Sequence, residues 1–200
     1  MLIREVMTTA VITVRPTDPV RSAIRTLYEH NVTAAPVLDE AGRLVGIVSE
    51  MDLLRGEFDP DPRASVRFRP GAPEPPPAVV SDVMTSEVTT TTETADVASL
   101  TGVMISQKIK SVPVLRGSEL VGIVSRRDLL GVLTRSDQAI RADVVALLTE
   151  QDPHGSSYSV EVRNGVVELS GGPPEDQRHL AERLTRTVPG VVRVRRSTAR

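Results

Sequence analysis

The sequence predicts an α+β fold made of two β-α-β-β-α repeats and a smaller α-β-β-α-β unit. Three observations support this prediction. Leu44–Leu54 (LVGIVSEMDLL) recurs as Leu120–Leu130 (LVGIVSRRDLL), with differences at only two positions. Shorter matches upstream keep the same order at an offset of 77 residues, which indicates an internal repeat. After Leu133 the apolar pattern changes. We therefore expect repeats at 1–55 and 81–135, a linker at 56–80 and a third unit at 137–200.

An amphipathic helix is predicted near the start of each repeat, after a short extended segment. The helices span Pro19–Asn31 and Asp96–Lys108. In the first helix, apolar residues recur on one face, as in a helix that covers a core. These residues are Val20, Ala23, Ile24 and Leu27. Short polar side chains before the helices, Asp18 in the first repeat and Thr94 or Asp96 in the second, are candidate N-caps.

A β-hairpin and a second helix complete each repeat. Two apolar runs, Pro-Val-Leu and Leu-Val-Gly-Ile-Val, flank a short turn that contains glycine. Gly46 and Gly122 lack a side chain, so another backbone or a ligand can approach closely there. The pattern Ser-x-x-Asp then begins the second helix, and it has two interpretations. In the first, it resembles a capping box. In the second, the start of the helix binds a phosphate and the aspartate accepts from ribose hydroxyls.

Composition excludes several kinds of function. The net charge is -2, so no bulk attraction to nucleic acid is expected. The chain has no cysteine and only three scattered histidines, so we expect no thiolate chemistry, no catalytic residues and no metal site. Aromatic residues make up 2%, which disfavours a base-stacking platform. Without a long apolar run or a signal-peptide pattern, a cytoplasmic protein is expected.

The segment between the repeats is rich in proline. Arg55–Val80 holds seven prolines, in DPDPR, RPGAPE and PPP. Because proline fixes φ and removes a backbone donor, this segment is predicted to be an extended spacer. A ligand for an aromatic-groove domain is the alternative.

The third unit is predicted to begin with a helix over Asp137–Thr149. Alternating apolar residues then flank Asn164-Gly165, the preferred pair for a two-residue hairpin turn. A second helix is expected over Glu175–Val188, with an amphipathic strip of Leu180, Arg183, Leu184 and Val188. Pro189-Gly190 ends it, and a basic strand, Val191–Arg196, follows.

The repeated unit resembles a CBS domain, and the tandem resembles a CBS pair, or Bateman module, over about Leu2–Leu133. The resemblance rests on Val-Met-Thr, Pro-Val-Leu and Gly-Ile-Val-Ser-x-x-Asp-Leu-Leu, each present twice in the same order. It implies a pseudo-symmetric pair of repeats with adenosine nucleotides bound in clefts between them. It also implies a regulatory or sensor role rather than an enzyme, and a homodimer.

The third unit is similar to a BON domain. The matching pattern is Val160-x-Val162-x-x-Gly165-x-Val167-x-Leu169-x-Gly171, followed by Pro189-Gly190-Val191-x-x-Val194. The Gly172-Pro173-Pro174 insertion departs from the usual continuation of this strand. The resemblance implies weak contact with phospholipid or another surface. A solvated edge protected by charge explains the basic last strand equally well.

The CBS resemblance implies a set of nucleotide-binding positions, for a ligand such as AMP, ADP or ATP. Aspartates would accept from ribose hydroxyls, and serines would contact ribose or phosphate. Two threonines and the two residues before proline would frame the adenine by backbone and small side chains. The expected residues are Thr13, Ala35, Ser49, Asp52, Thr90, Val112, Ser125 and Asp128.

Arg126 and Arg127 are the main difference between the repeats. They replace Glu50 and Met51 at the helix start, where a cation opposes the helix dipole unless an anion is present. We therefore include both arginines in the nucleotide site, with Lys108 and Lys110 as further candidates. Exposed arginines without a role are the alternative. Two other hypotheses stay open for the whole chain: a ligand-free structural adaptor for an unknown protein partner, and membrane-surface attachment through the third unit.

Overall fold

The computed structural model describes residues 1–55, 57–58, 63, 76–151, 158–171 and 175–196. The chain divides into two compact units. One comprises Thr8–Glu93 and Ser111–Ile123, and the other comprises Met1–Met7, Thr94–Lys110 and Val124–Arg200. Each unit therefore contains parts of both sequence repeats. Most of the predicted proline-rich spacer lies outside the described residues.

The first repeat keeps the predicted order of helix, hairpin and second helix, but its expected extended segment before the first helix forms only the single bridge of Val14 and no strand. The regular elements follow in chain order. They are η1 (Ile3–Glu5), α1 (Val20–Glu29), β1 (Ala34–Leu38), β2 (Leu44–Ser49) and α2 (Glu50–Leu53). The predicted apolar face of α1 is confirmed, with Ile24 only half-buried. The N-cap prediction for Asp18 is wrong, because Pro19 occupies the cap position. The Asp18 carboxylate instead accepts from the Arg15 N–H (2.7 Å).

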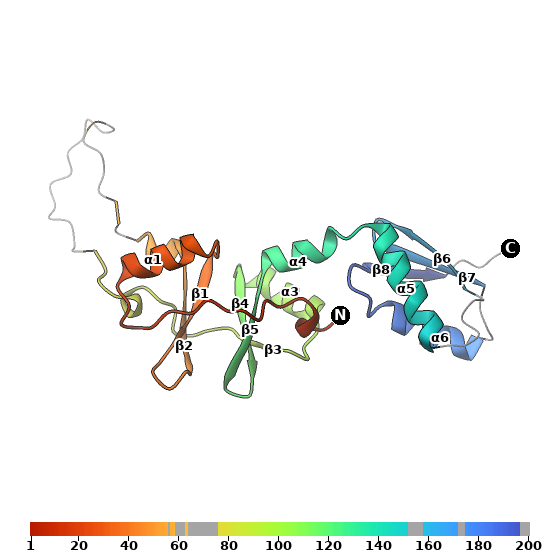
Figure 1. Ribbon diagram of the computed structural model, residues 1–200, viewed down its shortest axis with the longest axis horizontal. Coiled ribbons are helices and arrows are strands. Elements are labelled where there is room, and N and C mark those ends of the chain that lie inside the picture. The colour runs from red at the N-terminus through yellow and green to blue at the C-terminus, as the bar shows by residue number, and fades with distance from the viewer. Residues whose placement is uncertain (56, 59–62, 64–75, 152–157, 172–174, 197–200) are drawn as a thin grey trace. The chain divides into compact units, whose positions relative to one another are not determined.

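The second repeat has the same plan. Its elements are η2 (Val80–Asp82), β3 (Thr91–Thr92), α3 (Val97–Ser106), β4 (Ser111–Arg116), β5 (Glu119–Ser125) and α4 (Arg126–Leu133). Asp96 is the N-cap of α3 and accepts from the Ser99 N–H (3.2 Å), as predicted. Figure 1 shows the two hairpins, β1–β2 and β4–β5. The parallel strand β3 joins β4, whereas the first repeat has only a single bridge, Val14 to Val37, at this place.

The Val-Met-Thr segment at the start of each repeat pairs with the hairpin of the other repeat. Thr85 exchanges two backbone hydrogen bonds with Ile47 of β2 (both 2.9 Å), and Thr8 exchanges two with Ile123 of β5 (both 3.0 Å). Gly46 makes the first approach feasible, since a Cβ there would lie 2.6 Å from Met84 Sδ. The predicted close approach at this glycine is confirmed, and its nearest partner is the Met84 side chain of the other repeat, with the Thr85 carbonyl at 3.2 Å.

The core of the unit that holds α1 and β1 is aliphatic. It consists of Val14, Val20, Ala23, Leu27, Ala35, Val37, Val48, Leu53, Val80 and Val83. Val83 belongs to the Val-Met-Thr segment of the second repeat, and Val80 lies just before it at the end of the predicted linker, so the exchanged segment contributes to this core as well as to the sheet. The apolar run Leu44–Val48 was expected to be a buried strand, but only Gly46 and Val48 are buried, whereas Leu44, Val45 and Ile47 are half-buried.

The third unit has the predicted α-β-β-α-β order. Its elements are α5 (Asp137–Gln151), β6 (Tyr158–Arg163), β7 (Val166–Gly171), α6 (Glu175–Thr185) and β8 (Arg193–Arg196). The strand order is β6-β7-β8, which puts the basic strand β8 at an edge. Asn164 and Gly165 both have positive φ (51° and 71°), as a type I′ turn requires. The Gly172-Pro173-Pro174 insertion lies outside the described residues. So does Asp152-Pro153-His154-Gly155, whose proline and glycine are expected to end the first helix of this unit.

The predicted apolar strip of α6 is partly wrong. Leu180 is 57% exposed, whereas Ala181 and Val188 are buried, as is Thr185. The helix is rotated by one residue from the expected phase, so small residues face α5 and the sheet. Regular helix ends at Thr185, three residues earlier than predicted, and Val188 is reached through a turn.

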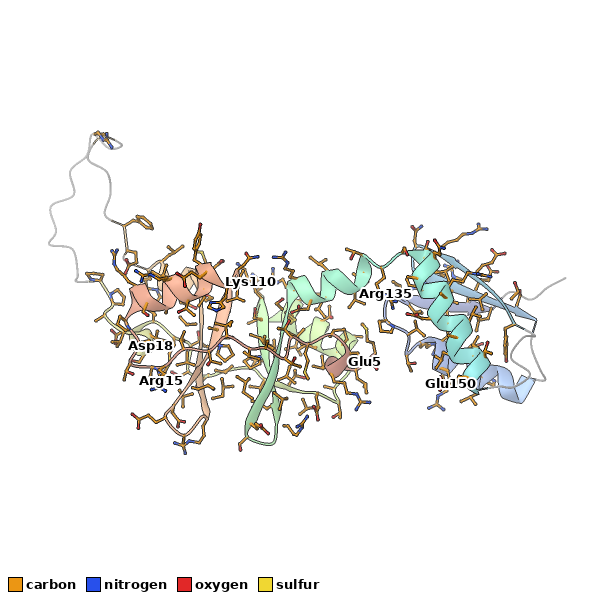
Figure 2. The ribbon with its side chains drawn as sticks, viewed as in Figure 1. Glu5, Arg15, Asp18, Lys110, Arg135 and Glu150 are labelled. Atoms are coloured by element: carbon orange, nitrogen blue, oxygen red, sulfur yellow. The ribbon has the colours of Figure 1, made fainter. Side chains whose placement is uncertain are left out.

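Two side chains hold the start of α5 against the rest of the third unit. The Asp137 carboxylate accepts from the N–H groups of Asn164 (2.8 Å) and Gly165 (2.9 Å) at the hairpin turn. Arg135, which Figure 2 labels at the junction of α4 and α5, donates to the Pro189 carbonyl (2.7 Å) and pairs with Asp143. Among the described residues, no helix is both long and apolar enough to cross a bilayer.

Candidate functional site

The second helix of the first repeat begins at a capped corner. Asp52 Oδ2 accepts from the Ser49 N–H (2.9 Å) and from the Ser49 hydroxyl (2.6 Å). Both side chains are half-buried. The carboxylate therefore satisfies a backbone donor at the end of β2 and adds negative charge to the first turn of α2, which favours the helix.

The second repeat builds the same corner. Asp128 Oδ2 accepts from the Ser125 N–H (2.7 Å) and hydroxyl (2.6 Å), and the Asp128 N–H donates to the Ser125 hydroxyl oxygen (3.4 Å). The capping-box interpretation is thus realised in both repeats. It does not exclude ribose binding, because an ionised carboxylate has about four acceptor positions and the cap described here uses Oδ2.

The other expected site residues fall into two groups by exposure. Ala35 and Val112 are wholly buried. Ala35 pairs across the hairpin with Val48, and its methyl group belongs to the core. These two positions lie behind the accessible surface and support it. Thr13 and Thr90, by contrast, are exposed and occupy equivalent places in the two repeats. Thr13 precedes Val14, which bridges to β1, and Thr90 precedes Thr91, which pairs with β4.

Thr13 lines a groove of about 360 Å³ at the turn end of the first hairpin. The other lining residues are Val14, Arg15, Asp18, Leu38, Asp39, Glu40 and Gly42. The Ser49 corner belongs to the opposite end of the hairpin, since Ser49 pairs with Ala34. Figure 2 labels two of these residues, Arg15 and Asp18, which lie close together, and the Arg15 N–H donates to the Asp18 carboxylate. Thr13 and Asp52 are therefore not brought together by the hairpin alone.

One acidic residue of this groove, Asp39, holds the turn. Asp39 accepts from Arg43 Nε (2.7 Å) and from the N–H groups of Arg43 (2.8 Å) and Ala41 (3.0 Å). The Arg43 guanidinium, through this side-chain bond, keeps the pKa of Asp39 below its usual value. Within the described residues, no cluster of three or more His, Asp and Glu side chains could hold a metal ion.

The Arg126 side chain lies against the end of the preceding helix. Its guanidinium donates to the carbonyls of Lys108 (3.3 Å) and Ile109 (3.4 Å), just after α3. Lys108 has a positive φ of 60°, so these carbonyls turn out of the helix. Sequence reasoning missed this role, because contact with a distant carbonyl leaves no local pattern. Bonds of this length are weak, so the guanidinium is able to turn toward an anion.

Sequence reasoning also missed Thr85 and Thr8 as neighbours of the two hairpins. The repeated Val-Met-Thr was visible, but its pairing with the opposite repeat was not. Thr85 lies beside Ile47, two residues before Ser49, and is exposed. This residue therefore lies near the first capped corner.

Comparison with known proteins supports both resemblances. The family model described as CBS domain matches residues 3–58 and 80–135, and the model described as BON domain matches residues 136–198. The chain is 30% identical over 129 residues to MJ1404 of Methanocaldococcus jannaschii, which is 64% of this chain and 31% of that protein. The chain thus spans about a third of this relative.

Two solved structures are similar to the chain and contain adenosine compounds. The CBS domain pair of MJ0100, in complex with 5′-methylthioadenosine and S-adenosyl-L-methionine, has 25% identity and a TM-score of 0.54, over 66% of this chain and 94% of that one. CBSX2 in complex with AMP has 26% identity and a TM-score of 0.53, over 65% and 93% of the two chains. The ligands of both proteins share the adenosine group.

Proposed function

We propose, since this chain belongs to the CBS domain family and ends in a BON domain, that its CBS pair binds an adenosine-containing ligand such as AMP, ADP or ATP. Ligand binding then regulates what the BON domain or a partner protein does. The observation that carries this proposal is the capped Ser–Asp corner, present twice with the same hydrogen bonds. It places a half-buried carboxylate at a helix start in each repeat.

The chemistry of the corner suits the ribose of an adenosine ligand. An ionised carboxylate accepts from two neighbouring hydroxyls, and a hydrogen bond to a charged group contributes about 1.5–3 kcal/mol. Asp52 and Asp128 are assigned this role, with Ser49 and Ser125 beside them. The related structures with methylthioadenosine, S-adenosylmethionine and AMP support adenosine as the shared part of the ligand.

The remaining assignments follow the same proposal. Thr13 and Thr90 contact the ligand from exposed positions, and Ala35 and Val112 support the adenine pocket from behind. Arg127 contacts the phosphate chain, and Arg126 joins it by leaving the carbonyls after α3. The protein acts as a regulator rather than as an enzyme, and it forms a homodimer through its CBS pair.

The experiment that tests this function is a ligand screen on the full chain. AMP, ADP, ATP, S-adenosylmethionine and NAD are added separately, and the unfolding temperature is followed. A ligand that binds only the folded state raises this temperature, and the stabilisation grows with the logarithm of ligand concentration over Kd. Hits are then quantified by calorimetry, with inorganic phosphate and ribose as controls. If no adenosine compound binds at millimolar concentration, the proposal fails and the ligand-free adaptor replaces it.

A further inference from the structure

The two edge strands of the sheet in the third unit are not alike. The strand order is β6-β7-β8, so β6 and β8 are the edge strands (Figure 1). On β6, the Val160 carbonyl accepts from Nε of Arg141 on α5 (2.9 Å), so a side chain of the same unit occupies a backbone acceptor of this strand. Among the described residues, no side chain bonds to the backbone of β8. Alternate N–H and C=O groups along β8 are therefore open to a further strand.

Two arginines of β8 lie on the open face of this sheet. The buried residues of β6 and β7 pack with residues of α5 and α6, so the two helices cover one face. Val194, in the middle of β8, packs against the same core. Because side chains alternate between the faces along a strand, Arg193 and Arg195 belong to the opposite face, and both are exposed.

The neighbours of these arginines on β7 differ in charge. Arg195 lies beside Glu168, whereas Arg193 lies beside Val166. Within the part of the chain that the structure describes, neither guanidinium forms an ion pair. A fourth strand next to β8 would place its own side chains directly beside both arginines, on the side away from β7. The charge of Arg193, which β7 does not balance, is then the stronger requirement on that strand.

The charges decide which strand fits this edge. Opposite charges side by side on neighbouring strands stabilise a sheet, and like charges destabilise it. Two copies of β8 would set arginine against arginine, so the edge is protected against pairing with itself. An acidic strand is favoured instead, and it satisfies the open backbone groups as well as the arginines. An anionic lipid surface would neutralise the arginines but would leave those backbone groups unpaired by a ladder.

The other face of such a strand would be apolar. Val192, directly before β8, is 62% exposed, and Val194 is half-buried. Apolar side chains on the added strand would cover the remaining exposed surface of Val194, as cross-strand neighbours do. The fitting segment therefore alternates acidic and apolar residues.

We infer that β8 is the docking edge for an extended acidic segment of a partner protein, which adds a fourth strand to the sheet. The acidic side chains of this segment lie beside Arg193 and Arg195, and its alternate apolar side chains lie on the face that the helices cover. The inference names the kind of partner for the third unit. It does not depend on the adenosine ligand, so either proposal can fail while the other stands.

Charge reversal tests the choice of partner. The full-length protein is titrated with a short capped peptide of alternating valine and glutamate, and with a counterpart in which lysine replaces glutamate. The wild type should bind the glutamate peptide about tenfold more tightly. The double variant Arg193→Glu, Arg195→Glu should prefer the lysine peptide. The matched control Arg183→Glu, Arg186→Glu changes two exposed arginines on or just after α6 and should keep the wild-type preference. An equal preference of the wild type and the edge variant would overturn the inference.

Tethering makes weak strand addition measurable. Each peptide sequence is fused to the end of the full-length chain through a glycine-serine linker, which gives an effective concentration of about a millimolar. The glutamate fusion should raise the unfolding temperature and slow amide hydrogen exchange in β8, and the lysine fusion should do neither. A fusion with proline in place of valine keeps the charge but lacks alternate N–H groups, so it should also leave exchange unchanged.

Two outcomes of this experiment count against the inference. Unchanged exchange in β8 of the glutamate fusion would overturn strand addition. If exchange is unchanged, and vesicles that contain phosphatidylserine bind the wild type but not the variant Arg193→Glu, Arg195→Glu, the basic strand contacts a lipid surface instead.

Discussion

The two repeats share a backbone corner and differ in the charges around it. In both, a serine donates its N–H and hydroxyl to the aspartate three residues on. In both, the residue directly after the serine donates its N–H to a carbonyl that follows the first helix of the repeat. That next residue is Glu50 in one repeat and Arg126 in the other. The groups that hold the backbone are therefore the same, and the groups beside them have diverged.

The hairpin turns show the same contrast. In the first repeat, Asp39 and Arg43 pair within the turn itself. In the second repeat, Arg116 at the end of β4 reaches Glu93 with two bonds (3.0 and 2.7 Å), and this pairing raises the pKa of Arg116. One fold is thus stabilised by a local ion pair in one copy and by a distant one in the other.

The largest expected effect is on the shared corner. Asp52→Ala and Asp128→Ala should each weaken the binding of AMP by about ten- to hundredfold, because each removes a charged acceptor worth about 1.5–3 kcal/mol. Each should also cost about 0.5–2 kcal/mol of stability through the lost cap. Calorimetry on the folded variants measures the first effect, and chemical denaturation measures the second.

A matched control separates these two effects. Asp82 caps a 3-10 turn by accepting from the N–H groups of Ala78 (3.0 Å) and Val79 (3.1 Å). Asp82→Ala should therefore reduce stability without changing affinity. If Asp52→Ala, Asp128→Ala and the double variant all bind AMP as the wild type does, the aspartates act only as caps.

The next effect concerns two glycines at different places, Gly46 in β2 and Gly131 in α4, which differ in the space around them. Gly46→Ala should destabilise the chain by about 1–3 kcal/mol, because the added Cβ overlaps Met84 Sδ and approaches the Thr85 carbonyl. Gly131→Ala should stabilise it by up to about 1 kcal/mol, because that helix position is open. Chemical denaturation at one protein concentration compares the two variants.

A second substitution sharpens the Gly46 prediction. In a Met84→Ala background, most of the overlap is gone, so Gly46→Ala should cost less than it does in the wild type. Equal costs in both backgrounds would contradict a direct clash between the exchanged segment and β2.

A smaller effect is expected from the diverged charges. Replacing Arg126 and Arg127 with Glu and Met, the residues of the first repeat, should lower ATP affinity by up to about fivefold more than adenosine affinity. The excess should shrink in added salt, because partly exposed charges are screened. The ratio of the two affinities isolates the phosphate chain, because adenosine shares the rest of the ATP molecule. An unchanged ratio would show that the arginines serve the protein surface only.

The smallest effect concerns the first hairpin turn at low pH. Because Arg43 holds the pKa of Asp39 below its ordinary value of 3.8, the ionised carboxylate contributes stability above that pH. This contribution is lost as the pH falls through the lowered pKa. The melting temperature of Asp39→Asn should therefore be slightly below that of the wild type near neutral pH and should converge with it in acid. A constant difference at every pH would contradict this assignment.

Much of the candidate site followed from local sequence. Ser49, Asp52, Ser125 and Asp128 were placed at helix starts because a capping box has a fixed spacing of three residues. The side-chain contact of Arg126 and the complete burial of Ala35 could not be predicted in this way. Contact with a carbonyl 18 residues away depends on how two helices meet, and no short pattern encodes it.

The sequence by itself determined the duplicated unit, the kinds and order of the elements, the Asn164-Gly165 turn and the two capped corners. Each depends on interactions within a few residues, where side-chain period, φ preference and cap chemistry decide the outcome. Only the tertiary structure decided that Val-Met-Thr of each repeat pairs with the other repeat's hairpin, and that α6 buries Ala181 rather than Leu180. These depend on which surfaces fit when distant segments meet, because hydrogen-bonding edges and apolar faces are chemically alike until packing selects among them.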